Sequence, residues 1–414
     1  MLRVTFALNF TMQQTYLPKE AEDVYIFEGY DPLIACFEEN PSLKGCLYFD
    51  GFTGRRIAEI HPDLAERIRK GAARGQFEIG TYTYNHPILS LIPHEDCVRQ
   101  IAKGLEIDEN VWGVRPRGLL LPEGGYDPGL VKILADLGLD YILMSPRTFY
   151  RDNPSAATAD LHRSYDLKGI FESHVRCVMT DDAAVPGDTQ VYICGGIIQG
   201  GDQSVRQFKG RFDEVKGGGD GDGLLVASKN DADFVYSDSL KVKYGPDERW
   251  AHYGESLGDL PWERMRDMAK GWARLAALDD VRFTTAAEYV DEFEPVREVS
   301  LRPAFGWYKS FAEWLAGSEK VGCVWDEARS EIKHAEYALR LAGKLGFDTA
   351  AAEANLAEAW DHLMLAEISV GRRACAHVGG QPSRVAYSME EALTAKRLAS
   401  EALELLERET AGEN

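Results

Sequence analysis

The chain has 414 residues, 67 acidic against 46 basic side chains and a formal net charge of -21 at pH 7. This length is enough for a large catalytic domain with an appended module. The acidic surface should repel nucleic acid phosphates and anionic lipids, so we expect neither nucleic acid nor membrane partners. The seven Cys include no CxxC pair, which argues against a zinc ribbon or a disulfide framework and fits a reducing cytoplasm.

The first residues, "MLRVTFALNFTMQQTY", predict a β-strand and not a secretory leader, because they hold one basic residue and only a short apolar run. No window approaches the roughly 18 consecutive apolar residues of a membrane span. We therefore expect a cytoplasmic protein.

Residues 1–298 alternate short β-rich runs with helical patterns, which is typical of βα units around a parallel sheet. Gly75 and Gly138 stand where helix C-caps are expected. The pattern predicts a closed or nearly closed α/β barrel. The expected strands are 2–10, 44–50, 76–82, 117–122, 140–145, 190–196, 223–228 and 281–286, and the expected helices include 63–75, 95–107, 127–138 and 261–278.

Residues 199–223 interrupt this rhythm with a glycine-rich stretch, "QGGDQSVRQFKGRFDEVKGGGDGDG". We predict an exposed loop here. Such a loop could contact substrate or serve as a lid, or it could be disordered without a function.

Residues 299–414 predict a C-terminal helical bundle, because strand signals vanish and apolar residues recur every three or four positions. The bundle could be scaffolding only, or polar side chains near Trp360 could complete the active-site rim. Its last helix could pack within the bundle or pair with a second copy of the chain.

The sequence has no His spacing typical of a catalytic metal, and no nucleotide or serine-nucleophile motif follows an expected strand. The nine His show no HxH, HxxxH or HExxH spacing, and the first strand ends in Asn9 with no His or Asp to act as a ligand. No GxSxG, Walker A or GxGxxG motif follows a strand. We therefore expect neither a metal nor another cofactor in catalysis.

Glu123 is the first candidate catalytic residue. It follows "LLLP" directly, and Pro122 cannot continue a strand ladder, so the carboxylate should stand at the carboxyl end of a buried strand. A surface turn or helix cap is the alternative.

Two further polar groups follow expected strands. Asp231 and Asp233 come after the run that ends at residue 228, where they could be catalytic or ordinary turn residues. Glu78, Tyr84 and His86 lie in "QFEIGTYTYNHP", a combination suited to sugar rings, although a buried Tyr cluster explains it equally well. Two carboxylates without a metal are the groups that glycoside hydrolases use.

The segments "GQFEIGTYTYNHPILSLIP" and "RPRGLLLPEGGYDPGLVKILADLGLDYILMS" resemble the second and third signature regions of glycoside hydrolase family 57. The resemblance spans most of residues 1–295. It implies an incomplete (β/α)7 barrel over residues 1–298 followed by a helical region, and a retaining enzyme that acts on α-glucans or related α-glycosides.

By position, Glu123 matches the catalytic nucleophile of that family. "KNDADF" resembles the fourth region, with Asp231 as the acid/base and Asp233 as the second choice. Gln13 stands where the family usually has His, and Gln14 keeps an amide. Val370 stands where an Asp often follows Ser.

The resemblance therefore predicts a metal-independent hydrolase or glycosyl transferase for an α-linked oligosaccharide or polysaccharide, with α-galactosides open as substrates. A polysaccharide deacetylase would need an early Asp and paired His for its metal. A non-catalytic sugar-binding relative is the other alternative. The expected substrate contacts are Gln13, Gln14, Glu78, Tyr84, His86, Tyr126 and Trp360.

Overall fold

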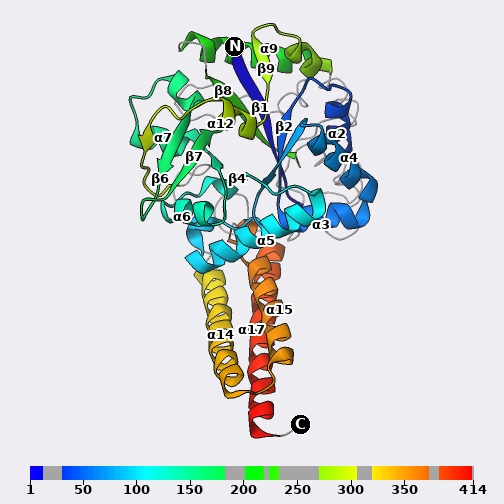
Figure 1. Ribbon diagram of the computed structural model, residues 1–414, viewed down its shortest axis with the longest axis vertical. Coiled ribbons are helices and arrows are strands. Elements are labelled where there is room, and N and C mark those ends of the chain that lie inside the picture. The colour runs from blue at the N-terminus through cyan, green and yellow to red at the C-terminus, as the bar shows by residue number, and fades with distance from the viewer. Residues whose placement is uncertain are drawn as a thin grey trace. The chain divides into compact units, whose positions relative to one another are not determined.

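The computed structural model describes residues 1–12, 30–181, 201–218, 223–232, 270–304, 319–372 and 382–412. The chain divides into two compact units, residues 1–309 and 310–414. The first unit holds all the described strands and the helices around them, and the described part of the second is helical (Figure 1).

The first unit is built from one sheet with helices between its strands. The strands are β1 Leu2–Phe10, β2 Gly45–Phe49, β3 Phe77–Thr81, β4 Gly118–Leu120, β5 Tyr141–Met144, β6 Ser164–Lys168, β7 His174–Met179, β8 Leu225–Asp231, β9 Val281–Phe283 and β10 Glu298–Val299. The helices are α2 Asp31–Glu38, α3 Gly51–Ile60, α4 Pro62–Ala73, α5 His94–Trp112, α6 Gly129–Asp136, α7 Pro146–Asp152, α9 Gly201–Gly217 and α12 Ala286–Glu292, with short 3₁₀ helices η3 Leu89–Leu91, η4 Pro122–Gly124 and η5 Thr158–His162.

The strand order confirms the incomplete (β/α)7 barrel. Strands β8, β1, β2, β3, β4, β5 and β7 are neighbours in this order and pair in parallel. Beyond β7, β6 pairs antiparallel to it and β10 pairs with β6. Strand β9 pairs with Leu2–Val4 of β1, on the edge that β2 leaves uncovered there.

The first and last strands of this parallel set, β8 and β7, meet through one backbone hydrogen bond. The Asp181 amide, two residues after β7, donates to the Ala227 carbonyl of β8 at 2.7 Å. Two residues before Ala227 in β8, the Leu225 carbonyl is contacted by Nδ1 of His162 from η5 at 2.9 Å. Arg211 of α9 binds Asp181 at 2.7 Å, and both side chains are buried. The barrel is therefore incomplete as a ladder, and buried polar contacts bridge the gap.

Apolar side chains fill both faces of the curved sheet. One cluster packs outside the sheet against α5 and α6, and a second fills the barrel interior. Inside, the Tyr48 and Tyr141 hydroxyls lie 3.0 Å apart. The rings need space that Gly80 and Gly118 leave free, since a Cβ at Gly80 would lie 2.2 Å from the Tyr48 ring.

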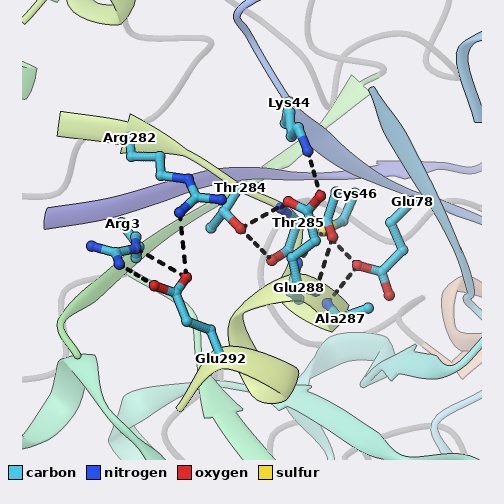
Figure 2. Close-up of polar contacts among 11 residues, drawn as sticks. Arg3, Lys44, Cys46, Glu78, Arg282, Thr284, Thr285, Ala287, Glu288 and Glu292 are labelled. Carbon is cyan, nitrogen blue, oxygen red and sulfur yellow. Dashed lines mark hydrogen bonds and ion pairs between the residues drawn. The ribbon is translucent and has the colours of Figure 1, made fainter. Parts of the chain in front are cut away.

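Helix α12 covers the amino ends of the strands and contributes to the interior cluster. Its N-cap Thr285 and Glu288 form a reciprocal capping box, with both bonds at 3.2 Å. Ion pairs tie Glu292 to Arg3 of β1 and Glu288 to Lys44 (Figure 2). These contacts close the base of the barrel on the side away from the strand carboxyl ends.

Most of the predicted elements are confirmed. The strands expected at 2–10, 44–50, 76–82, 117–122, 140–145 and 223–228 are present with small changes at their ends. Gly75 and Gly138 take the left-handed backbone expected of C-caps, at φ 69° and 77°. The strand expected at 190–196 lies outside the described residues. We did not predict β6, β7 or β10, which alternate polar and apolar residues near the sheet edge.

The expected loop at 199–223 is wrong over most of its length, because residues 201–217 form helix α9. Phe208, Phe212 and Val215 recur at helical spacing and are each at most 1% exposed. Within this apolar stripe, Phe208 packs on Phe6 of β1, with ring centroids 5.9 Å apart, on the strand face opposite Ala7 and the barrel interior. This packing stabilises a helix despite its glycines.

The second unit contains the predicted helical bundle. Helix α14 (Glu319–Leu345) and helix α15 (Ala350–Ala366) both pack along α17 (Pro382–Ala411), and α16 (Ser369–Arg372) is short (Figure 1). Inside it, Trp325 Nε1 donates to Ser388 Oγ, which donates to the Ala366 carbonyl. Within the described ranges, no helix combines the length and apolarity needed to cross a membrane.

We predict that Gly118→Ala destabilises the barrel. The new Cβ would lie 2.0 Å from Cζ of the Tyr141 ring, which is itself buried and bonded. Overpacking of this kind costs about 1–3 kcal/mol of unfolding free energy, measurable by urea unfolding. Gly210→Ala is the matched control, because its Cβ meets nothing within 4 Å and Ala favours the α9 helix. Equal stability of the two variants would contradict the packing argument.

Candidate active site

The candidate site lies where the parallel strands end. Asn9 is the next-to-last residue of β1, and its register partner is Asp231, the last residue of β8. Asp50 follows β2 directly, and Glu123 follows β4 in η4. Parallel pairing brings these carboxyl ends to one rim, the edge at which α/β barrels carry their chemistry.

Glu123 has an unusual backbone. Its φ of 51° and ψ of 12° lie in the left-handed region, although it is not glycine. Such a conformation costs about 1–3 kcal/mol and is concentrated at functional sites. Pro122 and Gly124 on either side are buried, whereas Glu123 is half-buried. The strain thus falls on the carboxylate that the sequence singled out.

The chain after Glu123 is held by residues 298–304, which we call the strap. Tyr126 and Ala304 exchange backbone hydrogen bonds of 2.8 and 2.9 Å in an antiparallel bridge. The Arg302 amide donates to Asp152 at 2.8 Å, and Arg151 and Arg302 hold the pKa of that partly buried carboxyl well below its usual range. The strap therefore fixes the loop that carries Glu123.

The ring of Tyr126 belongs to the core outside the sheet, where it is completely buried. Burial raises the pKa of its hydroxyl above the ordinary value. The Tyr126 ring packs against the helix layer, and this position does not support a contact with substrate. The predicted substrate contact of Tyr126 stays a prediction.

The segment after β3 brings the predicted residues Tyr84 and His86 to the rim. Thr83 and His86 have φ of 72° and 53°, a second strained pair beside the strand ends. The His86 ring lies 4.5 Å from that of Tyr82, and Lys103 lies 4.5 Å from the Tyr84 ring centroid. Tyr84 and His86 are each 2% exposed, so any sugar contact needs this segment to open.

Asp50 is a rim carboxylate that our reading of the sequence missed. It caps α3 by accepting the Thr53 amide at 2.6 Å and the Thr53 hydroxyl at 3.1 Å. Burial raises its pKa to about 6, and bonds from Thr11 and Thr53 oppose that rise. The signal was available, because Asp50 directly follows the strand "CLYF" as Glu123 follows its own strand.

Asn9 is a second missed rim residue. Its side chain is 1% exposed, and its Oδ1 has no hydrogen-bond partner among the residues that the structure describes. It shares the strand face of Ala7, which lies in the interior cluster. The amide is thus available to a ligand in the mouth of the barrel.

Glu78, a predicted substrate contact, lies at the other end of the barrel. Its carboxylate accepts the Ala287 amide of α12 at 2.8 Å and the Cys46 thiol at 3.3 Å (Figure 2). It also accepts the Tyr141 hydroxyl. Burial raises the pKa of Glu78 above its ordinary value, although these donors oppose the shift. The contacts give Glu78 a role in anchoring α12, and its contact with substrate stays a prediction.

Trp360 lies on α15 in the second unit. Its Nε1 donates to Glu336 of α14 at 2.9 Å, and Lys333 lies 4.9 Å from the ring centroid. It borders a pocket of ≈ 280 Å³ between these helices, whose lining also includes Arg340 and Glu353. That the bundle completes the active-site rim stays a prediction.

Of the remaining predicted residues, the structure describes only the backbone of Asp231. Gln13, Gln14 and Asp233 lie outside the described residues. Asp231 is placed by its backbone, as the last residue of β8.

Comparison with known proteins shows a likeness to one enzyme family over part of the chain. Residues 7–169 match the sequence model of glycosyl hydrolase family 57, a range that contains Glu123. This range of the chain is similar to family 57. Alpha-amylase 1 of Dictyoglomus thermophilum is 33% identical over 122 residues, and a 4-alpha-glucanotransferase of Thermococcus kodakarensis is 33% identical over 121. These matches cover 30% and 29% of this chain but only 18% of each relative.

Solved structures are similar in fold to this chain over its whole length. A branching enzyme from Pyrococcus horikoshii superposes with a TM-score of 0.68 at 14% identity, covering 100% of this chain and 91% of that one. The alpha-amylase AmyC from Thermotoga maritima gives a TM-score of 0.67 at 16% identity, with 100% and 94% covered. At these identities the likeness establishes the fold alone.

We predict that Asp50 makes the stability of this protein fall as pH rises. Its folded pKa of about 6 exceeds the ordinary 3.8, so the folded state binds the proton more tightly. The free energy of unfolding then decreases between these two pH values, and the loss is complete above pH 6. Asp50→Asn keeps a good N-cap but carries no charge, so it should gain up to about 3 kcal/mol relative to wild type between pH 4 and 7.

The measurement is chemical unfolding of both proteins across this pH range. Asp136→Asn is the control, because Asp136 is exposed on α6 beside Lys132. A difference between wild type and Asp50→Asn that does not change with pH would contradict the buried charge.

Proposed function

We propose that this protein is a retaining glycoside hydrolase or glycosyl transferase that acts on α-linked glucans or oligosaccharides. The observation that carries the proposal is Glu123, a carboxylate in a strained left-handed backbone at the carboxyl end of β4, inside the range that matches family 57. Relatives of part of this chain are named as amylases and 4-alpha-glucanotransferases, whose names refer to α-glucans.

In the proposed reaction Glu123 attacks the anomeric carbon and forms a β-linked glycosyl-enzyme. Asp231 protonates the departing glycosidic oxygen and then removes a proton from the incoming acceptor. Water as the acceptor gives hydrolysis, and a sugar hydroxyl gives transfer. Two carboxyl groups in these roles stand about 5–5.5 Å apart in retaining enzymes.

Neighbouring groups have supporting roles in this proposal. The strap holds the Glu123 loop in place, so the nucleophile does not need to be ordered by the substrate. Asn9, whose Oδ1 has no partner among the described residues, is available to accept a sugar hydroxyl. Gln13, Gln14, Tyr84 and His86 complete the proposed substrate contacts near the ends of β1 and β3.

Replacement of Glu123 tests the nucleophile. We expect Glu123→Ala to lower kcat/KM on aryl α-glucosides and maltooligosaccharides by about 10³-fold or more, because no covalent intermediate can form. Azide should restore turnover and give a β-glycosyl azide, detected by NMR. Asp136→Asn, an exposed acid on the following helix, should keep wild-type activity. A β-anomer as the first product of the wild type would contradict retention.

The same panel should include aryl α-galactosides and a parallel assay with EDTA. The sugar that turns over identifies the specificity, and activity that survives EDTA supports a mechanism without a metal. Loss of activity with EDTA at an unchanged thermal midpoint would contradict that part of the proposal.

A comparison of Asp231→Ala with Asp233→Ala tests the acid/base. Loss of the acid should slow substrates with poor leaving groups by about 10²–10⁴-fold, while activated dinitrophenyl glycosides are affected less. The variant should also lose the alkaline limb of the pH profile. If only Asp233→Ala behaves in this way, the two roles are exchanged.

A sugar-binding protein without turnover is the second candidate, because Gln13 stands where the family usually has His. Glutamine keeps a hydrogen-bonding group but cannot titrate near neutral pH. Unchanged binding of maltooligosaccharides by wild type and Glu123→Ala, with no turnover of any substrate, would favour this candidate.

A further inference from the structure

Three potential metal ligands meet at the edge of the sheet, outside the barrel mouth. Asp166 of β6, His174 of β7 and Glu298 of β10 each offer one ligand atom, and these atoms all lie within 4.8 Å of one another. Nδ1 of His174 is 3.1 Å from Oδ2 of Asp166. The three residues come from three neighbouring strands, so the sheet ladder sets their spacing.

The charge pattern of these strands also favours a cation. Asp166 and Glu298 are direct register partners, and like charges opposite each other destabilise a sheet. Nearby cations have other partners: Lys168 pairs with Glu172 at 2.5 Å, and Arg176 donates to a backbone carbonyl after α12 at 3.0 Å. Lys168 adds only a longer-range electrostatic attraction for Glu298.

We propose that Asp166, His174 and Glu298 bind a divalent transition metal, with zinc as the best fit. One imidazole nitrogen and two carboxylate oxygens are ligands that zinc accepts. Two ligands about 2 Å from a tetrahedral ion lie about 3.3 Å apart, close to the distance between His174 and Asp166. Both side chains are about one-third exposed, at 34% and 35%, so water can complete the coordination.

The consequence of this metal is structural. Glu298 begins the strap, and Ala304 at its other end bridges to Tyr126 beside the Glu123 loop. A metal that joins Glu298 to β6 and β7 therefore fixes one end of a segment whose other end supports the nucleophile. It replaces the repulsion between Asp166 and Glu298 by attraction to a shared ion.

Zinc titration tests the proposal in the full-length chain. Cys323 carries an exposed thiol that could bind zinc, so the parent protein carries Cys323→Ser. Zinc chloride titrated by calorimetry should show one ion per chain, and cobalt(II) should give a visible spectrum of nitrogen and oxygen ligation. His174→Ala, Asp166→Asn and Glu298→Gln should each weaken zinc binding by about tenfold or more.

Two further variants sharpen the test. His334→Ala removes an exposed histidine of the second unit and should leave the affinity unchanged. Lys168→Gln removes a competing positive charge and should tighten binding. Zinc should also raise the thermal midpoint of the parent and slow amide exchange at residues 298–299, with neither effect in His174→Ala.

Several results would overturn the proposal. The first is no zinc binding by the parent, and the second is equal zinc affinity in all variants. The third is zinc-induced protection from amide exchange that occurs only at residues outside the strap and its neighbouring strands. Metal-free thermal unfolding of each variant separates a lost ligand from a lost fold, and Asp166→Asn is a nearly isosteric check. Because the readouts are binding and exchange, they do not depend on catalytic activity.

Discussion

Parallel pairing is the constraint on which the rest of this structure depends. Each strand from β8 through β1 to β7 runs in the same direction, so every strand ends on the same rim. Asn9, Asp50 and Glu123 come together because of this, although they are far apart in the sequence. The opposite ends carry packing instead, with Glu78 bound to the first turn of α12. The carboxyl ends of the strands are thus available for chemistry, and their amino ends are closed by α12.

The barrel achieves this separation without a complete ladder. Among the described residues, one backbone hydrogen bond joins the ends of β7 and β8, from the Asp181 amide to the Ala227 carbonyl, and Arg211 of α9 forms a buried ion pair with Asp181. A buried ion pair contributes little net stability, but removal of one partner leaves an unpaired charge. The gap between β7 and β8 therefore depends on the Asp181–Ala227 bond and the Arg211–Asp181 pair, which a continuous strand ladder would not need.

Backbone strain in the first unit is concentrated at the rim. Glu123, Thr83 and His86 all have left-handed backbones, and each follows a parallel strand. The other two such residues, Phe171 and Glu172, form the turn between β6 and β7. Strain at the rim must be balanced by neighbouring contacts, and for Glu123 the strap provides them. The proposed zinc ligand Glu298 stands at the start of that strap, so the proposed metal at the sheet edge would be linked through the strap to the loop that carries Glu123.

The sequence alone determined the features that depend on local chemistry. Periodic apolar runs identified most strands and the long helices, and Pro122 placed Glu123 just beyond a buried strand. Tertiary packing decided what local patterns could not. Residues 201–217 became a helix because Phe208 and its neighbours found a core to enter. Glu78 went to the base of the barrel because it lies three residues before the end of β3, about 10 Å along the strand from the rim. Burial and long-range pairing set these outcomes, and neither is visible in a single stretch of residues.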